Sequence, residues 1–126
     1  MAALSAWHEQ HAPAATALAP VTALPAHVVL ESYSVLTRLP GGLAVPSELA
    51  ASVLARRFPD PPLQLDAADR VALPGRLAAA GVRAGAAYDG LVALEAATAG
   101  ETLLSLDTRA QRTYRRLAVA FQLVGM

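Results

Sequence analysis

Short apolar segments alternate with helical segments along this chain, and proline or glycine residues separate most of them. The last third shows the pattern clearly: the strand-like segment TLLSLD is followed by a helical segment, TRAQRTYRRL, and then by a second strand-like segment, VAFQLV. Strands that alternate with helices are typical of α/β folds with a mostly parallel sheet. We therefore expect an α/β protein whose central sheet is mostly parallel.

Proline and glycine residues also predict where the other elements begin and end. Pro46 stands at the first turn of one expected helix and Gly100 follows the end of another, which are the positions that these residues favour. Pro74 and Gly75 are expected to kink or divide the helix that begins at Asp66. We expect helices over residues 2–11, 26–40, 47–58, from 66 towards 81 and 86–99, and short strands within residues 18–27 and over 63–65.

The composition favours one soluble domain and excludes several classes of protein. The chain has 126 residues, 55% of them apolar, which suffices for one core but not for two domains, so we expect a single domain over residues 1–126. No segment offers the roughly 18 apolar residues of a membrane helix. The absence of cysteine excludes disulfides and thiolate chemistry and suits the cytoplasm. A formal net charge of +0 argues against non-specific nucleic-acid binding through a large basic face.

Three acidic residues each have an ordinary structural explanation. Glu31 falls on the apolar stripe that Val28 and Val35 define on one helix. An unpaired buried charge is costly, so this carboxylate needs an arginine partner or a rotation towards solvent. Asp89 lies in the first turn of its helix, where the helix dipole favours a negative charge. Asp107 ends a strand-like segment and precedes a helix, so it suits an N-cap.

Taken together, the three carboxylates predict a metal site. In an open parallel sheet, ligands gather beyond the carboxyl ends of the strands. Asp107 stands at such an end, and Glu31 and Asp89 occupy early turns of helices that follow strands or loops. Carboxylates gathered at one edge repel one another unless a cation lies among them, and oxygen ligands without cysteine suit Mg²⁺ or Mn²⁺. We therefore expect these three side chains to converge on one divalent ion.

Three segments, HVVLESYSVLTRLP, GAAYDGLVALEAATAG and TLLSLDTRA, resemble in order and spacing the signature segments of PIN-domain ribonucleases, in particular the VapC-like toxins of bacterial type II toxin–antitoxin pairs. The resemblance spans nearly the whole chain and implies a PIN-like three-layer α/β/α fold. The matching family residues share a Mg²⁺ or Mn²⁺ site, and they correspond here to Glu31, Asp89 and Asp107. The resemblance thus implies metal-dependent hydrolysis of RNA by a toxin that forms a homodimer and that a cognate antitoxin protein holds in check.

The chain departs from that family before Glu31. PIN domains begin with a hydrophobic strand that ends in Asp-Thr-Ser or a similar triplet, and its aspartate is a principal metal ligand. No such segment precedes Glu31 here, so we expect the first strand to be absent, Mg²⁺ binding to be weak and RNA cleavage to be poor. A misplaced start codon or a truncated chain would account for the difference. The alternative hypothesis is a catalytically inactive PIN-like scaffold that binds a partner protein.

Arg109, Arg112 and Arg116 follow the segment TLLSLD at helical spacing. They are candidates for contacts with the RNA backbone, because guanidinium groups form strong hydrogen bonds to phosphate. A solvated helix face is the ordinary alternative. Tyr88 and Tyr114 are expected to lie in the core or at its rim, with base stacking as the alternative role.

Overall fold

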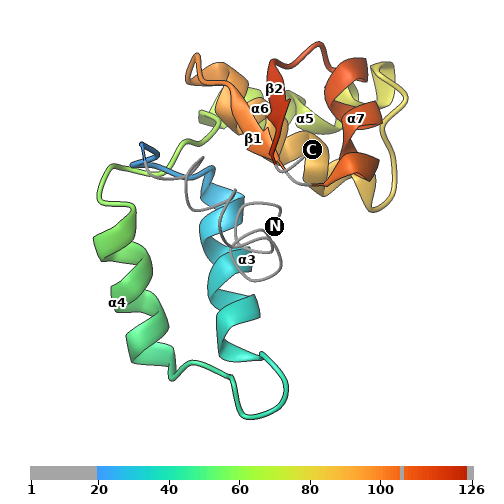
Figure 1. Ribbon diagram of the computed structural model, residues 1–126. Coiled ribbons are helices and arrows are strands. Elements are labelled where there is room, and N and C mark those ends of the chain that lie inside the picture. Colours follow the sequence, from blue (N-terminus) through green and yellow to red (C-terminus); the bar gives the residue numbers. More distant parts are fainter. Residues whose placement is uncertain (1–19, 106, 125–126) are drawn as a thin grey trace.

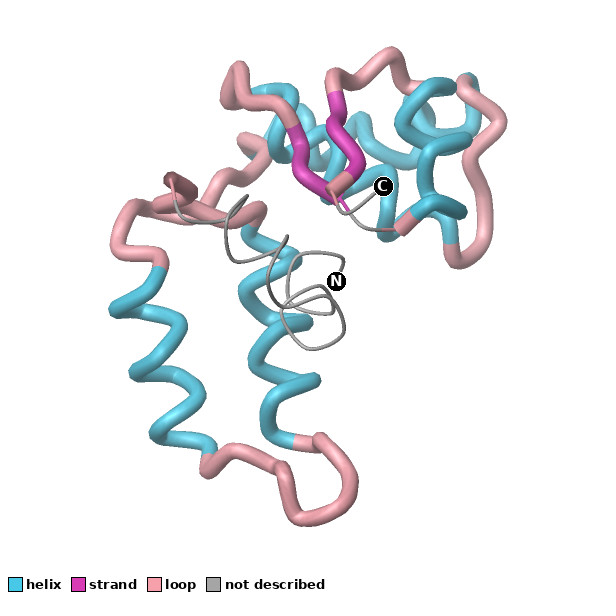
Figure 2. Tube along the Cα trace, in the orientation of Figure 1, coloured by secondary structure: helices cyan, strands magenta, loops and turns pink. Residues whose placement is uncertain are grey.

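Helices joined by loops make up most of the structure. The computed structural model describes residues 20–105 and 107–124 (Figures 1 and 2). The expected helix over residues 2–11 lies outside these described residues. The elements in chain order are α3 (Ala26–Thr37), α4 (Ser47–Arg57), α5 (Ala67–Ala79), α6 (Ala86–Thr98), β1 (Leu103–Ser105), the 3₁₀-helix η1 (Thr108–Ala110), α7 (Gln111–Arg116) and β2 (Phe121–Leu123).

Strands β1 and β2 form a parallel pair, in which Leu103 aligns with Phe121 and Ser105 aligns with Leu123. The chain between them forms η1 and α7 before it returns beside β1 (Figure 2). Parallel strands joined by a helical crossover are the repeating unit of α/β folds. The predicted fold class, an α/β protein with a parallel sheet, is therefore confirmed.

The strands expected within residues 18–27 and over 63–65 are reduced to one parallel bridge between Pro25 and Leu63. The N–H of Ala26 donates to the carbonyl of Leu63 at 2.7 Å. Among the described residues of these ranges the expected short strands do not form, because Pro25 has no N–H to continue a ladder and helix α3 begins at the next residue. The bridge nevertheless ties the start of α3 to the segment that leads into α5.

Helix α5 is continuous through Pro74, so of the two expected outcomes, a kink or a division, the division is wrong. Proline in a helix removes the hydrogen bond to the carbonyl four residues earlier, which here belongs to Arg70. Arg70 and Val71 are exposed, so water can reach that carbonyl. The helix begins as its sequence indicates, because the Asp66 side chain accepts a hydrogen bond from the N–H of Asp69 at 2.7 Å.

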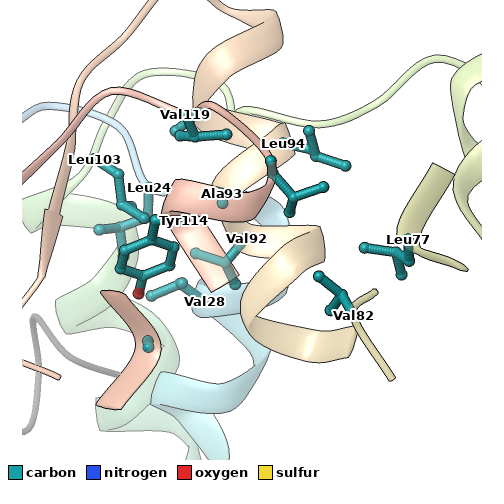
Figure 3. Close-up of a cluster of buried hydrophobic side chains, with 13 residues drawn as sticks. Leu24, Val28, Leu77, Val82, Val92, Ala93, Leu94, Leu103, Tyr114 and Val119 are labelled. Carbon is teal, nitrogen blue, oxygen red and sulfur yellow. The ribbon is translucent and has the colours of Figure 1, made fainter. Parts of the chain in front are cut away.

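Helix α6 runs through the centre of the hydrophobic core, and its residues 90–96 are all buried. Figure 3 shows Val92 and Leu94 of α6 in a cluster with Val28 of α3, Leu103 of β1 and Tyr114 of α7. Each fully buried aliphatic side chain stabilises the fold by about 1.5–3 kcal/mol relative to exposure. The core therefore packs three elements together: α3, which carries Glu31, α6, which carries Asp89, and β1, which leads to Asp107.

Helices α3 and α4 lie side by side and extend away from the sheet (Figure 1). This pair and the loop that joins it present large apolar side chains to solvent: the exposed fraction is 67% for Leu30 of α3, 58% for Leu43 of the loop and 49% for Leu49 of α4. None of the helices within the described ranges has the length and apolar character that crossing a membrane requires.

Gly90 is the point at which helix α6 approaches helix α5. A Cβ atom added at Gly90 would lie 2.6 Å from Cδ2 of Leu77, which is itself buried in the core. We expect Gly90→Val to lower the free energy of unfolding by about 1–3 kcal/mol, the usual cost of overpacking a core. Urea denaturation followed by circular dichroism measures this change.

Gly75 is the matched control, because it is also helical but has no atom within 4 Å of the position of an added Cβ. Gly75→Ala should raise the free energy of unfolding by about 0.5–1 kcal/mol, since alanine loses less backbone entropy in a helix. A Gly90→Val variant as stable as the parent would show that α5 and α6 are not packed this closely.

Candidate functional site

A cavity of about 650 Å³ is lined by residues 20–25, the start of α3, the loop near Asp60, helix α6 and the chain from Gly100 through β1 to Asp107. Acidic side chains dominate its charged lining, and no lysine, arginine or histidine of the described residues lines it. The acidic lining residues are Glu31, Asp60, Asp89, Glu101 and Asp107. Glu31, Asp89 and Asp107, which the sequence selects as candidate metal ligands, thus face one cavity although 76 residues separate the first from the last.

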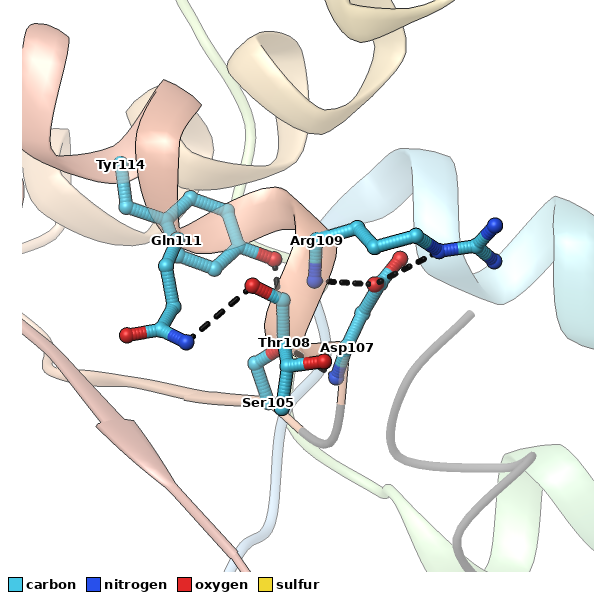
Figure 4. A network of polar contacts seen from close by, with 6 residues as sticks. All are labelled: Ser105, Asp107, Thr108, Arg109, Gln111 and Tyr114. Atoms are coloured by element: carbon cyan, nitrogen blue, oxygen red, sulfur yellow. Dashed lines mark hydrogen bonds and ion pairs between the residues drawn. The ribbon is translucent and has the colours of Figure 1, made fainter.

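Asp107 combines a structural role with a position at the cavity (Figure 4). Its Oδ1 accepts a hydrogen bond from the N–H of Arg109 at 2.9 Å and so caps η1, as the N-cap interpretation predicted. Its own N–H donates to Oγ of Ser105 at 3.1 Å, and that hydroxyl lies 3.2 Å from the hydroxyl of Tyr114. Oδ2 has no hydrogen-bond partner among the described residues. The carboxylate is therefore held at the end of β1 with one oxygen available to a ligand.

Asp89 lies in the first turn of α6 and is partly buried. Burial raises the pKa of its carboxyl above the ordinary value, and the negative charges of Asp107 and Glu31 raise it further, while Arg109 acts in the opposite direction. Burial is the main cause of the raised pKa, and the charges of Asp107 and Glu31 act on Asp89 in the same direction. A cation in the cavity would relieve the repulsion among these charges.

Glu31 is partly exposed, with 32% of its side chain accessible, which agrees with the alternative of a helix rotated towards solvent. The buried residues of α3 are Val28 and Ser32, and successive helical residues are about 100° apart. The buried side of α3 is therefore centred between Val28 and Ser32, roughly half a residue step from the stripe of Val28, Glu31 and Val35, which leaves Glu31 at the cavity edge. There its Oε1 contacts Nε2 of His27, one turn earlier on the same helix.

The chemistry of the three carboxylates fits Mg²⁺ or Mn²⁺, although their arrangement is open. No three Asp, Glu or His side chains in the described part of the chain lie close enough together to form a ready-made metal centre. Mg²⁺ commonly binds through only one or two carboxylates and keeps several waters, so it does not need a closed cage of protein ligands. A cavity whose charged lining residues are all carboxylates suits such an ion.

The three arginines singled out from the sequence have different surroundings. The Arg109 side chain is 96% exposed, with Nε 3.9 Å from Asp107 Oδ1, so it stands at the cavity edge. Arg112 is also exposed. Arg116 instead donates from Nη1 to the carbonyl of Gly81 at 2.7 Å and fastens α7 to the loop before α6. Contact with RNA stays a prediction for all three, and Arg116 already has a structural role.

Two residues near the site were not selected from the sequence. Glu95 is 1% exposed in the middle of α6 and accepts a hydrogen bond from the N–H of His27 at 3.1 Å. The imidazole of His27 stacks on the ring of Tyr88, with centroids 5.5 Å apart and planes inclined by 15°. The signal for Glu95 was present, since a single carboxylate interrupts the apolar helical segment GLVALEAA. No local pattern identifies His27, whose contacts arise from two different helices.

Comparison with known proteins places the chain among bacterial ribonucleases. It is 41% identical over 124 residues to "Ribonuclease VapC40" from two strains of Mycobacterium tuberculosis, and the match covers 98% of this chain and 92% of the relative. It is 43% identical over 97 residues to "Ribonuclease VapC27" from the same species, covering 77% of this chain and 70% of the relative. No family model and no solved structure matches the chain.

Proposed function

This chain belongs to the VapC family of PIN-domain ribonucleases, and from that membership we propose that it is a Mg²⁺- or Mn²⁺-dependent endoribonuclease, the toxin of a toxin–antitoxin pair. One observation of the structure carries the proposal: Glu31, Asp89 and Asp107 line the same cavity. The raised pKa of Asp89, caused by burial and by the two neighbouring carboxylates, adds support, because a divalent cation would offset this charge repulsion.

The three carboxylates would hold the ion, and each has a distinct means of support. Asp107 is fixed by the cap of η1 and by Ser105, and Asp89 by the first turn of α6. Glu31 is oriented by its pairing with His27. The chemistry that a divalent ion supplies at such a site is stabilisation of the negative charge that grows on the phosphate oxygens during hydrolysis.

Arg109 is the residue best suited to contact the RNA backbone beside the carboxylates. Its guanidinium is almost fully exposed and lies next to Asp107 at the cavity edge. Guanidinium groups form paired hydrogen bonds with phosphate oxygens, so Arg109 can orient a backbone phosphate next to the acidic lining. Arg112, on the following helix, can contact a neighbouring phosphate.

The proposed partners are an RNA substrate, a cognate antitoxin protein and a second copy of the chain, in the cytoplasm. The exposed apolar side chains of α3, α4 and the loop between them support protein association, since large exposed apolar patches commonly mark protein interfaces. These residues are Leu30, Leu43, Leu49 and Val53.

The test of the proposed activity is cleavage of RNA oligonucleotides by the purified chain in Mg²⁺, in Mn²⁺ and in EDTA. We expect weak cleavage with either ion, in keeping with the missing first aspartate, and none in EDTA, with the folded state verified by circular dichroism in every sample. Cleavage that continues undiminished in EDTA would contradict the metal dependence. A folded chain that binds a protein partner but cleaves no RNA with either ion would instead support the inactive scaffold.

A further inference from the structure

Glu95 is a buried carboxylate that takes no part in the proposed reaction. It lies in α6 between Leu94 and Ala96, is 1% exposed, and is not among the residues that line the acidic cavity. Burial raises the pKa of its carboxyl, whereas the hydrogen bond from the N–H of His27 acts in the opposite direction. Burying a carboxylate among apolar side chains costs free energy. We therefore ask what the hydrogen bond between Glu95 and His27 contributes to the structure.

The explanation lies at the start of helix α3, which lacks a cap of its own. The N-cap residue is Pro25, which makes no side-chain hydrogen bond, and the first turn contains no acidic residue. The first N–H groups of a helix have no partner within the helix and carry a partial positive charge. Oε1 of Glu95 accepts from one of these groups, the N–H of His27, at 3.1 Å. Helix α6 thus supplies the cap that helix α3 does not provide for itself.

His27 connects this cap to the candidate metal ligands. Its backbone is bound by Glu95, and its ring stacks on Tyr88, the residue before Asp89. The same ring pairs with Glu31, one turn further along α3. The beginning of α3 is therefore attached to α6 at two points, and the residue that makes both contacts also holds Glu31.

We propose that Glu95 is a positioning residue of the site, which fixes the start of α3 on α6 and thereby sets where Glu31 stands relative to Asp89. The proposal rests on the proposed function in one respect, namely that these two carboxylates share a divalent ion. Metal ligands supported by fixed neighbours bind more tightly than ligands free to move, and loss of such support commonly costs about 10–100-fold in metal affinity.

The test compares Glu95→Met, which keeps the length of the side chain but cannot accept the hydrogen bond, with Glu95→Gln, which keeps an acceptor oxygen. Two readouts use the metal-free protein: hydrogen exchange of the His27 amide and the nuclear Overhauser contact between the rings of His27 and Tyr88. A third is the affinity for Mn²⁺. Glu48→Gln, in the exposed first turn of α4, is the control for loss of an acidic residue.

In Glu95→Met we expect the exchange rate of the His27 amide to rise about tenfold, the ring contact to weaken and the affinity for Mn²⁺ to fall about tenfold or more. Glu95→Gln and Glu48→Gln should stay within about threefold of the parent in all three readouts. In Glu95→Gln the amide oxygen still caps α3, and Glu48→Gln does not alter this cap. Should Glu95→Met fail to fold, Glu95→Asp, whose shorter side chain does not reach His27, is expected to give the same three changes.

Two outcomes would overturn the proposal. The first is an unchanged His27 amide and an unchanged ring contact in both Glu95→Met and Glu95→Asp. The second is a loosened start of α3 with undiminished affinity for Mn²⁺. If the parent itself binds no Mn²⁺, the proposed function fails, and the two metal-free readouts still decide whether Glu95 holds α3 in place.

Discussion

Replacement of Asp89 by Asn is expected to lower the rate of RNA cleavage at least about 100-fold while the chain remains folded. Asn keeps the size of the side chain but removes a charge that a divalent ion needs, and such an ion stabilises the transition state by several kcal/mol, with each 1.4 kcal/mol worth about tenfold in rate. The measurement is the initial rate of cleavage of a fluorescent RNA oligonucleotide in saturating Mn²⁺.

Asp69 provides the control for this substitution, because it is also an aspartate in the first turn of a helix, α5, but is exposed and lies outside the cavity. Asp69→Asn should cleave RNA at the rate of the parent. If Asp89→Asn were equally active, Asp89 would be only a favourable charge at a helix terminus, and the proposed site would lose one of its three ligands.

The same variant should be more stable than the parent when metal is absent. Burial and the nearby carboxylates raise the pKa of Asp89 in the folded chain, so the folded state binds this proton more tightly than the unfolded state does. The parent therefore loses stability as pH rises from the ordinary value of 3.8 through the raised pKa, and Asp89→Asn does not. Urea denaturation in EDTA from about pH 4 to about pH 7 should show an advantage of the variant that grows with pH.

Replacement of Asp107 by Asn should also reduce RNA cleavage at least about 100-fold, for the same loss of charge at the cavity. Its effect on stability should be small, within about 0.5 kcal/mol, because Asn and Asp are similarly good N-cap residues and the cap of η1 is retained. Asp107→Asn is thus expected to lose RNA cleavage but to keep its stability, although Asp107 contributes to both.

Asp66 is the matched control for Asp107, since it caps α5 through the same kind of hydrogen bond but lies outside the cavity. Asp66→Asn should leave both stability and cleavage close to those of the parent. A drop in cleavage that appears in both variants would point to a general effect of cap replacement and against a special role for Asp107.

Local signals in the sequence were sufficient for most of the fold. Pro46 precedes the start of α4 and Gly100 follows the end of α6, as expected, and Leu103–Ser105 within the segment TLLSLD form a strand that pairs in parallel with β2. The errors have tertiary causes. Pro74 did not divide α5 because the affected carbonyl faces solvent, and Pro25 shortened an expected strand to a bridge because α3 starts directly after it.

The site was less accessible to sequence reasoning. Asp107 and Asp89 occupy the strand end and the helix start that their neighbours predict. Periodicity left two positions open for Glu31, in the core beside an arginine or turned towards solvent, because it does not fix the rotation of a helix that packs on both α4 and α6. His27 and Glu95 are 68 residues apart, and their hydrogen bond exists only because α3 and α6 meet. Such contacts leave no spacing pattern in the sequence.

The central claim is that Glu31, Asp89 and Asp107 together hold one divalent ion. Its most direct test is a Mn²⁺ titration followed by electron paramagnetic resonance on the parent and on Glu31→Gln, Asp89→Asn and Asp107→Asn. Asp60→Asn serves as a control, because Asp60 lines the same cavity but is paired with Thr22. We predict one Mn²⁺ per parent chain, an affinity lowered about tenfold or more in each of the three variants, and no change in Asp60→Asn. Equal affinity in the parent and the three variants would contradict the claim.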